Sequence, residues 1–255
     1  MTRRRLSADD CAVVLGADYG FEAECVRARH ACNMRNLQRL LPDTILEIGC
    51  GVDLLYDQAR AAALPFSRWT IVEPAEAYAA LADARAATDA RLEVVRGYCE
   101  DVAKPGGALE GAAFAAVVLS GVLHHVPDPA LVVRDAVARL QPGGSLLVTC
   151  PNARSFHRLL AVEMGLIAEP GELGARNFAL GQFNVFDRDS LGALLASAGL
   201  VDLQFEGYLF KPFPHPQMSA VLRELPDGTA RALDELGRRF PDNAAEIGIV
   251  GRLPD

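Results

Sequence analysis

Five apolar runs of strand length constrain the fold of this chain more than any other feature. Each run is nearly continuous rather than alternating with polar residues, which is typical of parallel strands that are buried on both faces. Stretches rich in alanine and leucine separate the runs and are predicted to be helices. This alternation predicts an open α/β sheet, in which right-handed crossovers put helices on both faces. The runs are TILEIG (44–49), WTIVEP (69–74), RLEVVRG (91–97), AAVVLSG (115–121) and SLLVTCP (145–151).

The segments before and after these runs extend the pattern. Residues 8–41 are predicted to be helical and to end before Pro42. Residues 151–186 carry glycines, Pro170 and scattered aromatic residues, which indicates an insertion rather than a sheet element. The alternation then resumes with a helix (189–200) that Gly199 ends, a strand (201–210), a helical stretch near 217–239 and a last strand (244–253).

Charge and hydropathy exclude two classes of partner. The net charge of -8 argues against a general nucleic-acid binder, which needs a basic face to meet phosphates. The one basic run, Arg3 to Arg5, lies at the terminus, where a solvated end is the simpler interpretation. No stretch approaches the ~18 uninterrupted apolar residues of a membrane span. We therefore expect neither a nucleic acid nor a membrane as partner.

The cysteines indicate the compartment. The chain has six of them, with no C-x-x-C pair and no cysteine–histidine cluster at zinc spacing, so no metal site is predicted. Scattered thiols in a chain of 255 residues suggest a reducing environment. Polar residues interrupt the stretch after Arg5, which argues against a signal peptide. We expect a cytoplasmic protein.

The stretch ILEIGCGVDLLYD (45–57) has the features of a ligand-binding turn. Gly49 and Gly51 fall where the first strand passes into a helix, and glycine there allows a ligand to approach the backbone closely. Glu73 ends the second strand about 20 residues further on, where a carboxylate can accept hydrogen bonds from ribose hydroxyls. The dinucleotide fingerprint G-x-G-x-x-G fails, because Leu54 stands at the third glycine. A different nucleotide ligand or an ordinary turn are the other interpretations.

Longer motifs carry a resemblance to a known family. LEIGCGVD, IVEP and AAVVLSGVLHHVPDPALVVRDAVARLQPGGSLLVTCPN together resemble class I S-adenosylmethionine-dependent methyltransferases, over residues 30 to 210. PNARSFHRLLAVEMGL, VFDRDSLGALLASAGL and LFKPFPHPQM further resemble small-molecule methyltransferases of sugar, polysaccharide and natural-product pathways. The chain departs from the family at Asp53, which stands at the usual third glycine, and at Tyr98, where an acidic residue is frequent.

The resemblance implies a fold and a division of the chain. The fold is α/β: a Rossmann-like, seven-stranded, mostly parallel sheet with helices on both faces, an antiparallel last strand and a small helical cover. Residues 1–255 are expected to form a single methyltransferase domain. Its expected parts are an N-terminal helical cover (8–41), a cofactor-binding core (42–150), a substrate-side insertion (151–186) and the C-terminal part of the sheet (187–255).

The resemblance also implies residues that bind S-adenosylmethionine, the expected cofactor, whose product is S-adenosylhomocysteine. These are Glu47, Gly49 and Gly51 under the methionine part, Glu73 at the ribose, Pro74 near the adenine, Cys99, Glu100 and Asp101 loosely at the adenine, and Ser120 facing the methionine. Structural alternatives stay open for three of them. Glu47 could pair with the N-terminal helix, Glu73 could be a helix N-terminal acid, and Ser120 could cap the next turn.

His124 and His125 are the candidate catalytic residues. The methyl group of the sulfonium is already activated, so the protein mainly aligns the acceptor and excludes water. A hydroxyl acceptor must still lose its proton, and histidine is the usual base near neutral pH. Neighbouring residues on an extended backbone cannot both enter one pocket, so we expect one to act and one to pack. His157 is a third candidate.

Residues on both sides of the core are candidates for binding the acceptor. They are Tyr19, His30, Asn152, Arg154, His157 and Arg158, with Arg29 as a further group that could reach the acceptor or the cofactor carboxylate. The forked guanidinium of arginine suits a phosphate or carboxylate, although a solvated helix face explains the arginines equally well. Lys211 and His215, among prolines, are expected to lie in a surface loop.

Three functions compete on these observations. The leading one is methyl transfer to an oxygen or nitrogen of a small metabolite, by a monomer or a homodimer. A non-catalytic methyltransferase-like binding protein is the second, because Asp53 and Tyr98 depart from the family pattern. A nicotinamide-dependent oxidoreductase is the third, and the missing third glycine argues against it.

Overall fold

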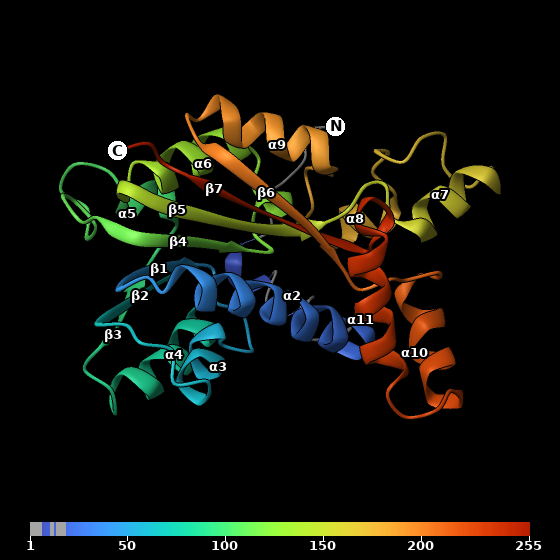
Figure 1. Ribbon diagram of the computed structural model, residues 1–255, viewed down its shortest axis with the longest axis horizontal. Helices are drawn as coiled ribbons and strands as arrows, with labels where there is room; N and C mark the ends of the chain where they lie inside the picture. Colours follow the sequence, from blue (N-terminus) through green and yellow to red (C-terminus); the bar gives the residue numbers. More distant parts are fainter. Residues whose placement is uncertain (1–6, 11–12, 14–18) are drawn as a thin grey trace.

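Seven strands form one sheet in the order β3-β2-β1-β4-β5-β7-β6 (Figure 1). The computed structural model describes residues 7–10, 13 and 19–255. The strands are β1 (Thr44–Ile48), β2 (Arg68–Glu73), β3 (Leu92–Arg96), β4 (Phe114–Ser120), β5 (Leu140–Pro151), β6 (Val201–Tyr208) and β7 (Glu246–Arg252). Each of the five strands β1, β2, β3, β4 and β5 is parallel to its neighbours within this group. β7 runs antiparallel to both β5 and β6. The predicted fold class, with its antiparallel last strand, is confirmed.

Helices cover both faces of the sheet (Figure 1). One face carries α2 (Tyr19–Leu40), α3 (Leu55–Ala61) and α4 (Glu76–Ala86), whose apolar side chains share a core with β1 and β2. The other face carries α5 (Cys99–Val102), α6 (Pro129–Val137) and α9 (Arg188–Ser197). Because both faces are covered, the central strands are apolar along their length, which explains the continuous runs in the sequence.

Local sequence sets the ends of several helices. The Asp128 carboxylate accepts a hydrogen bond from the Leu131 backbone N–H at 3.0 Å and caps α6, in front of Pro129 in the first turn. Asp187 caps α9 with Ser190 in a reciprocal pair, and Gly199 follows that helix at φ +89°. These caps lie close to the predicted boundaries, because cap residues act locally.

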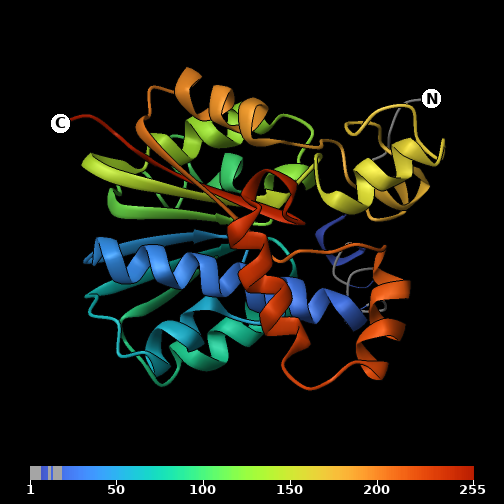
Figure 2. The same ribbon diagram turned by 45° about the vertical axis from the view of Figure 1, so that its right-hand side comes forward.

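The carboxyl ends of the parallel strands are covered by helices that the sequence predicted incompletely (Figure 2). Residues 151–186, predicted as an insertion rather than a sheet element, hold α7 (Phe156–Glu163) and α8 (Ala175–Ala179). The predicted helical stretch 217–239 is two helices, α10 (His215–Glu224) and α11 (Thr229–Arg239). Gly228, at φ +89°, separates them, since a left-handed residue cannot continue a helix.

The N-terminal helical segment is described only in part. Residues 8–10 are helical, and α2 starts at Tyr19 and ends at Leu40, next to Pro42 as predicted. Short 3-10 helices, η1 (Leu123–His125) and η2 (Pro241–Asn243), follow β4 and precede β7. Among the described residues, no helix is both long enough and apolar enough to cross a bilayer.

Candidate functional site

A cavity lies at the carboxyl ends of β1, β2 and β4, where the strand order reverses between β1 and β4. Open α/β sheets bind ligands at this switch point, because the loops there diverge to either side of the sheet. The predicted cofactor residues that line the cavity are Gly49, Gly51, Glu73, Pro74, Cys99, Glu100 and Ser120. Glu47 and Asp101 are not among the lining residues.

The glycine loop after β1 depends on backbone angles that favour glycine. Gly49 has φ +77° and Gly51 has φ +64°, in the left-handed region that a side chain disfavours. A Cβ on Gly49 would also lie 2.9 Å from the Cγ2 atom of Val122. The loop therefore brings bare backbone to the cavity, as a nucleoside-type ligand requires.

The Glu73 carboxylate is held rigidly at the cavity wall. Its Oε2 accepts a hydrogen bond from the Cys50 backbone N–H at 2.9 Å, and its Oε1 accepts one from Ala75 at 2.8 Å. Burial raises the pKa of Glu73, and these backbone hydrogen bonds oppose that rise by favouring the charged form. The carboxylate is thus oriented before any ligand arrives.

Glu47 lies beneath the loop rather than on the cavity wall. Its Oε2 accepts a hydrogen bond from the indole N–H of Trp69 at 2.9 Å, while its Oε1 is buried without a partner. Burial raises the pKa of Glu47 to about 8, so the group holds a proton at neutral pH. The alternative of pairing with the N-terminal helix does not describe this geometry, because the partner stands on β2.

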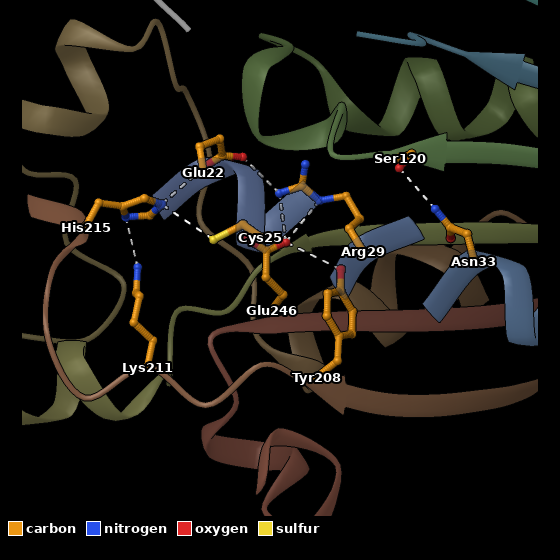
Figure 3. Close-up of polar contacts among 9 residues, drawn as sticks. All are labelled: Glu22, Cys25, Arg29, Asn33, Ser120, Tyr208, Lys211, His215 and Glu246. Carbon is orange, nitrogen blue, oxygen red and sulfur yellow. Dashed lines mark hydrogen bonds and ion pairs between the residues drawn. The ribbon is translucent and has the colours of Figure 1, made fainter. Parts of the chain in front are cut away.

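Two further cofactor candidates, Asp101 and Ser120, have different surroundings. Asp101 is exposed and pairs with Lys104 at 2.7 Å, outside the cavity. Ser120 Oγ accepts a hydrogen bond from the Asn33 side chain at 3.0 Å (Figure 3), so its partner is a residue of α2 rather than the next turn.

Arg29 reaches the cavity from α2. Its Nε and Nη2 donate to Glu246 at 3.2 and 3.1 Å, and its Nη2 lies 3.4 Å from Glu22 (Figure 3). A Cβ placed on Gly121 would be 3.0 Å from Arg29 Nη1, which puts the guanidinium against the loop after β4. The two carboxylates hold the pKa of Arg29 well above its ordinary value, although burial opposes them.

The two adjacent histidines have different positions. His125 lines the cavity, whereas His124 is buried and is not among the lining residues. Burial lowers the pKa of both rings, to about 4 for His125. Their ring centroids are 4.2 Å apart on η1. The geometry agrees with the expectation that one histidine faces the pocket and one packs; whether either is a base stays a prediction.

Most predicted acceptor residues have structural partners. The Asn152 amide donates to the Asp242 and Ala244 carbonyls, at 3.0 and 2.9 Å, and joins β5 to the segment before β7. Arg158 donates to the carbonyls of Pro170, at 2.6 Å, and Glu172. The Arg158 bonds hold the 165–174 loop, and neither Asn152 nor Arg158 is among the residues that line the cavity.

The other acceptor candidates also lie off the cavity wall. His30 is buried and contacts the Gln58 amide at 3.0 Å through Nδ1. His157 has a buried Nδ1 without a partner, and burial lowers its pKa to about 2. Arg154 is exposed, and the side chain of Tyr19 lies outside the described residues. None of these three described residues is among the lining residues.

The expectation that Lys211 and His215 lie in a surface loop is wrong. Lys211 is buried, and its Nζ contacts His215 Nδ1 at 3.1 Å (Figure 3). His215 Nε2 in turn lies 3.1 Å from Glu22 Oε2 and 3.5 Å from Cys25 Sγ. Proline-rich sequence indicated a loop, but α10 packs on α2 and encloses both residues.

Glu22, Cys25 and His215 bring three possible metal ligands within 4.8 Å of one another. The charges around them do not favour a cation. Lys211 approaches the far nitrogen of His215, which leaves the ring proton on Nε2, where a metal would bind. Burial and the nearby carboxylates also raise the pKa of the Cys25 thiol well above its ordinary value. We therefore interpret the group as a hydrogen-bonded network that joins α10 to α2.

Sequence reasoning did not identify Glu22 and Glu246 as site residues. Glu22 stands two helical turns before Arg29 on α2, so helical spacing could have linked these two. Nothing local indicates Glu246, which lies 217 residues from Arg29 in the sequence.

A family model for a methyltransferase domain matches residues 26–204, more than two thirds of the chain. The chain belongs to this family, and the resemblance to class I S-adenosylmethionine-dependent methyltransferases is confirmed. No match was found among curated proteins.

Solved structures share the fold at low sequence identity. Phosphoethanolamine N-methyltransferase 2 of Haemonchus contortus, with S-adenosylmethionine, is 18% identical over 88% of this chain, with a TM-score of 0.57. This chain spans about half of that enzyme, 53% of its length. The N-methyltransferase NodS of Bradyrhizobium japonicum, with S-adenosylhomocysteine, is 14% identical over 90% of this chain and 87% of its own, with a TM-score of 0.53. The [4+2]-cyclase SpnF is 16% identical over 86% of this chain and 80% of its own, with a TM-score of 0.54.

Proposed function

We propose that this chain transfers a methyl group from S-adenosylmethionine to an oxygen or nitrogen of a small molecule. The observation that carries the proposal is the fixed Glu73 carboxylate, hydrogen-bonded to the left-handed loop of Gly49 and Gly51, in one cavity at the switch point of the sheet. The carboxylate fits the two hydroxyls of a ribose, and the glycine loop fits a flexible chain attached to that ribose.

The residues around the cavity have distinct proposed roles. Glu73 holds the ribose, Pro74, Cys99 and Glu100 border the adenine, and the backbone at Gly49 and Gly51 lies under the methionine part. Arg29, pressed against Gly121, faces the methionine carboxylate. His125 borders the acceptor, and His124 packs behind it.

The protein's own contribution to the reaction is alignment. The bound donor supplies a methyl group on a positively charged sulfur, which is activated without further help from the protein. The chain holds donor and acceptor in line and keeps water out with apolar side chains such as Val26, Val122 and Phe183. No basic nucleic-acid surface is needed for a small acceptor.

Isothermal titration calorimetry with S-adenosylmethionine, S-adenosylhomocysteine and NADH tests the proposal. We expect binding of the first two and none of NADH. Glu73→Ala should weaken both by about 1–3 kcal/mol, because two ribose hydroxyls lose their acceptor. Glu93→Ala, on the exposed face of β3, is the matched control and should bind as the unmodified protein does.

One comparison favours a second candidate function, which is cofactor binding without methyl transfer. The cyclase SpnF shares the fold, so the fold alone does not require methyl transfer. Cofactor binding without any methylated product, across a screen of acceptors for a +14 mass change, would favour a non-methylating role. Binding of NADH in place of S-adenosylmethionine and S-adenosylhomocysteine would contradict both proposals.

A further inference from the structure

The acceptor side of the cavity has a carboxylate on its wall. This part is lined by Glu22 and Arg29 of α2, together with His125 and Phe183. It meets the proposed methionine side at the end of β4, where Arg29 lies against Gly121. An acceptor bound in this part of the cavity would lie next to Glu22.

Glu22 keeps its negative charge in this position. Burial raises its pKa, but the hydrogen bond with His215 and the charge of Arg29 lower it by more. The pKa of Glu22 is therefore about 2. A carboxylate has about four positions for accepting hydrogen bonds, so two donors leave room for a ligand. Arg29 itself makes its two shortest contacts with Glu246, so one guanidinium serves two carboxylates.

His125 is the only imidazole among the described residues that line the cavity. Its Nδ1 is buried without a partner, and the backbone of Leu180 and Gly181 hydrogen-bonds to the ring. Its pKa of about 4 also makes it a weak base. A hydroxyl acceptor needs a base at or near attack, and the Glu22 carboxylate, with a pKa of about 2, is also a weak one.

We propose that the acceptor is an amine, whose nitrogen receives the methyl group beside the Glu22 carboxylate. This inference rests on the proposed function. The lone pair of the neutral amine forms the new N–C bond, and the C–S bond breaks with its electron pair left on the sulfur. The positive charge passes from sulfur to nitrogen, where Glu22 stabilises it. The secondary or tertiary ammonium product then loses a proton to solvent, so no base is needed during transfer.

Matched amines and alcohols test the class of acceptor. The probes are benzylamine, phenethylamine and hexylamine, each compared with the alcohol of the same skeleton, and the readout is methylated product by mass spectrometry. We expect the amines to be methylated at least about tenfold faster, because only they place charge beside the carboxylate. The kcat/KM of each amine should rise with pH up to that amine's own pKa. A base on the enzyme would instead give the same pKa in the pH profiles of all three amines.

Variants on α2 test the role of Glu22. Glu22→Gln keeps the shape and removes the charge, and should lower kcat/KM for the amines at least about tenfold. Its affinity for S-adenosylhomocysteine, by calorimetry, should stay within about twofold, because Glu246 still holds Arg29. Glu24→Gln is the control, since Glu24 pairs with Arg27 on the exposed side of the same helix.

Three results would overturn the amine assignment while the proposed function stands. They are alcohols methylated as fast as amines, no amine methylated by protein that binds S-adenosylhomocysteine, and unchanged amine turnover in Glu22→Gln. Failure of the unmodified protein to bind S-adenosylhomocysteine would instead contradict the proposed function itself.

Discussion

Glu47 and Glu73 lie near the ends of neighbouring strands, yet their carboxylates have different surroundings. Glu73 receives backbone hydrogen bonds at a cavity, whereas Glu47 has one indole donor and is otherwise enclosed by apolar groups. Hydrogen bonds from N–H groups favour a charged carboxylate, and an apolar enclosure favours a neutral one. One residue type thus serves as a ligand acceptor in one position and as a buried acid in the other.

Glu47 makes the stability of the protein depend on pH. Its pKa rises from an ordinary 4.5 to about 8 in the folded state, so the folded protein keeps a proton that the unfolded chain loses between these values. The free energy of unfolding should therefore fall as pH rises across this window. Glu47→Gln should remove the fall and be more stable by about 1–3 kcal/mol near the upper end.

Urea unfolding at the two ends of the window measures this effect. Glu93→Gln, which changes an exposed carboxylate on β3, is the control and should keep the pH dependence of the unmodified protein. An equal slope in Glu47→Gln and in the unmodified protein would show that Glu47 is ionised in the folded state.

At the scale of elements, α11 approaches β6 closely enough to exclude side chains from the contact. A Cβ on Gly237 would lie 2.3 Å from the Leu209 backbone nitrogen, and one on Gly207 of β6 would lie 2.4 Å from Pro241 of η2, the short helix that follows α11. Backbone meets backbone at both points. This contact fixes the chain that leaves β6, and with it the position of Lys211.

Gly237→Ala should destabilise the protein by about 1–3 kcal/mol or more, because the added methyl group has no space and the opposing atoms are backbone. Chemical denaturation measures the loss. Gly171→Ala adds the same methyl group where nothing lies within 4 Å and should change stability little. Equal stability of the two variants would mean that α11 can shift away from β6 without cost.

At the scale of the whole molecule, the Arg29 network joins parts that are distant in sequence. Two cores lie on opposite faces of the sheet, and a third combines the first half of α2 with α10, the end of β6 and the residue before β7. Arg29 of α2 forms an ion pair with Glu246 of β7 in this third region. The two side chains are only 11% and 6% exposed, so removing either one leaves the charge of the other uncompensated.

Arg29→Ala should therefore destabilise the molecule by about 3–5 kcal/mol, since it leaves two carboxylates without their shared cation. Equilibrium unfolding in urea measures the change. Arg27→Ala breaks an exposed pair with Glu24 and should cost less than about 1 kcal/mol. Similar losses in both variants would show that the buried pair adds no more than a surface one.

The sequence by itself determined the alternation of strands and helices, the glycine loop and the carboxylate that ends β2. These features depend on local causes: continuous apolar runs, caps such as Asp128 and Asp187, and glycines at turns. The seven strands and the family followed from them. Local patterns also kept His124 and His125 together as candidates, without separating the one at the cavity from the one beneath it.

Only the tertiary structure decided which polar groups meet. Lys211 and His215 look like loop residues among prolines, yet α10 folds back on α2 and buries the lysine. Glu246 reaches Arg29 across 217 residues of sequence. No periodicity in the chain encodes such a meeting, because it depends on how the last strand enters the sheet and which helices pack over its end. The acceptor side of the cavity is made of these long-range contacts, and it therefore became visible only in the folded chain.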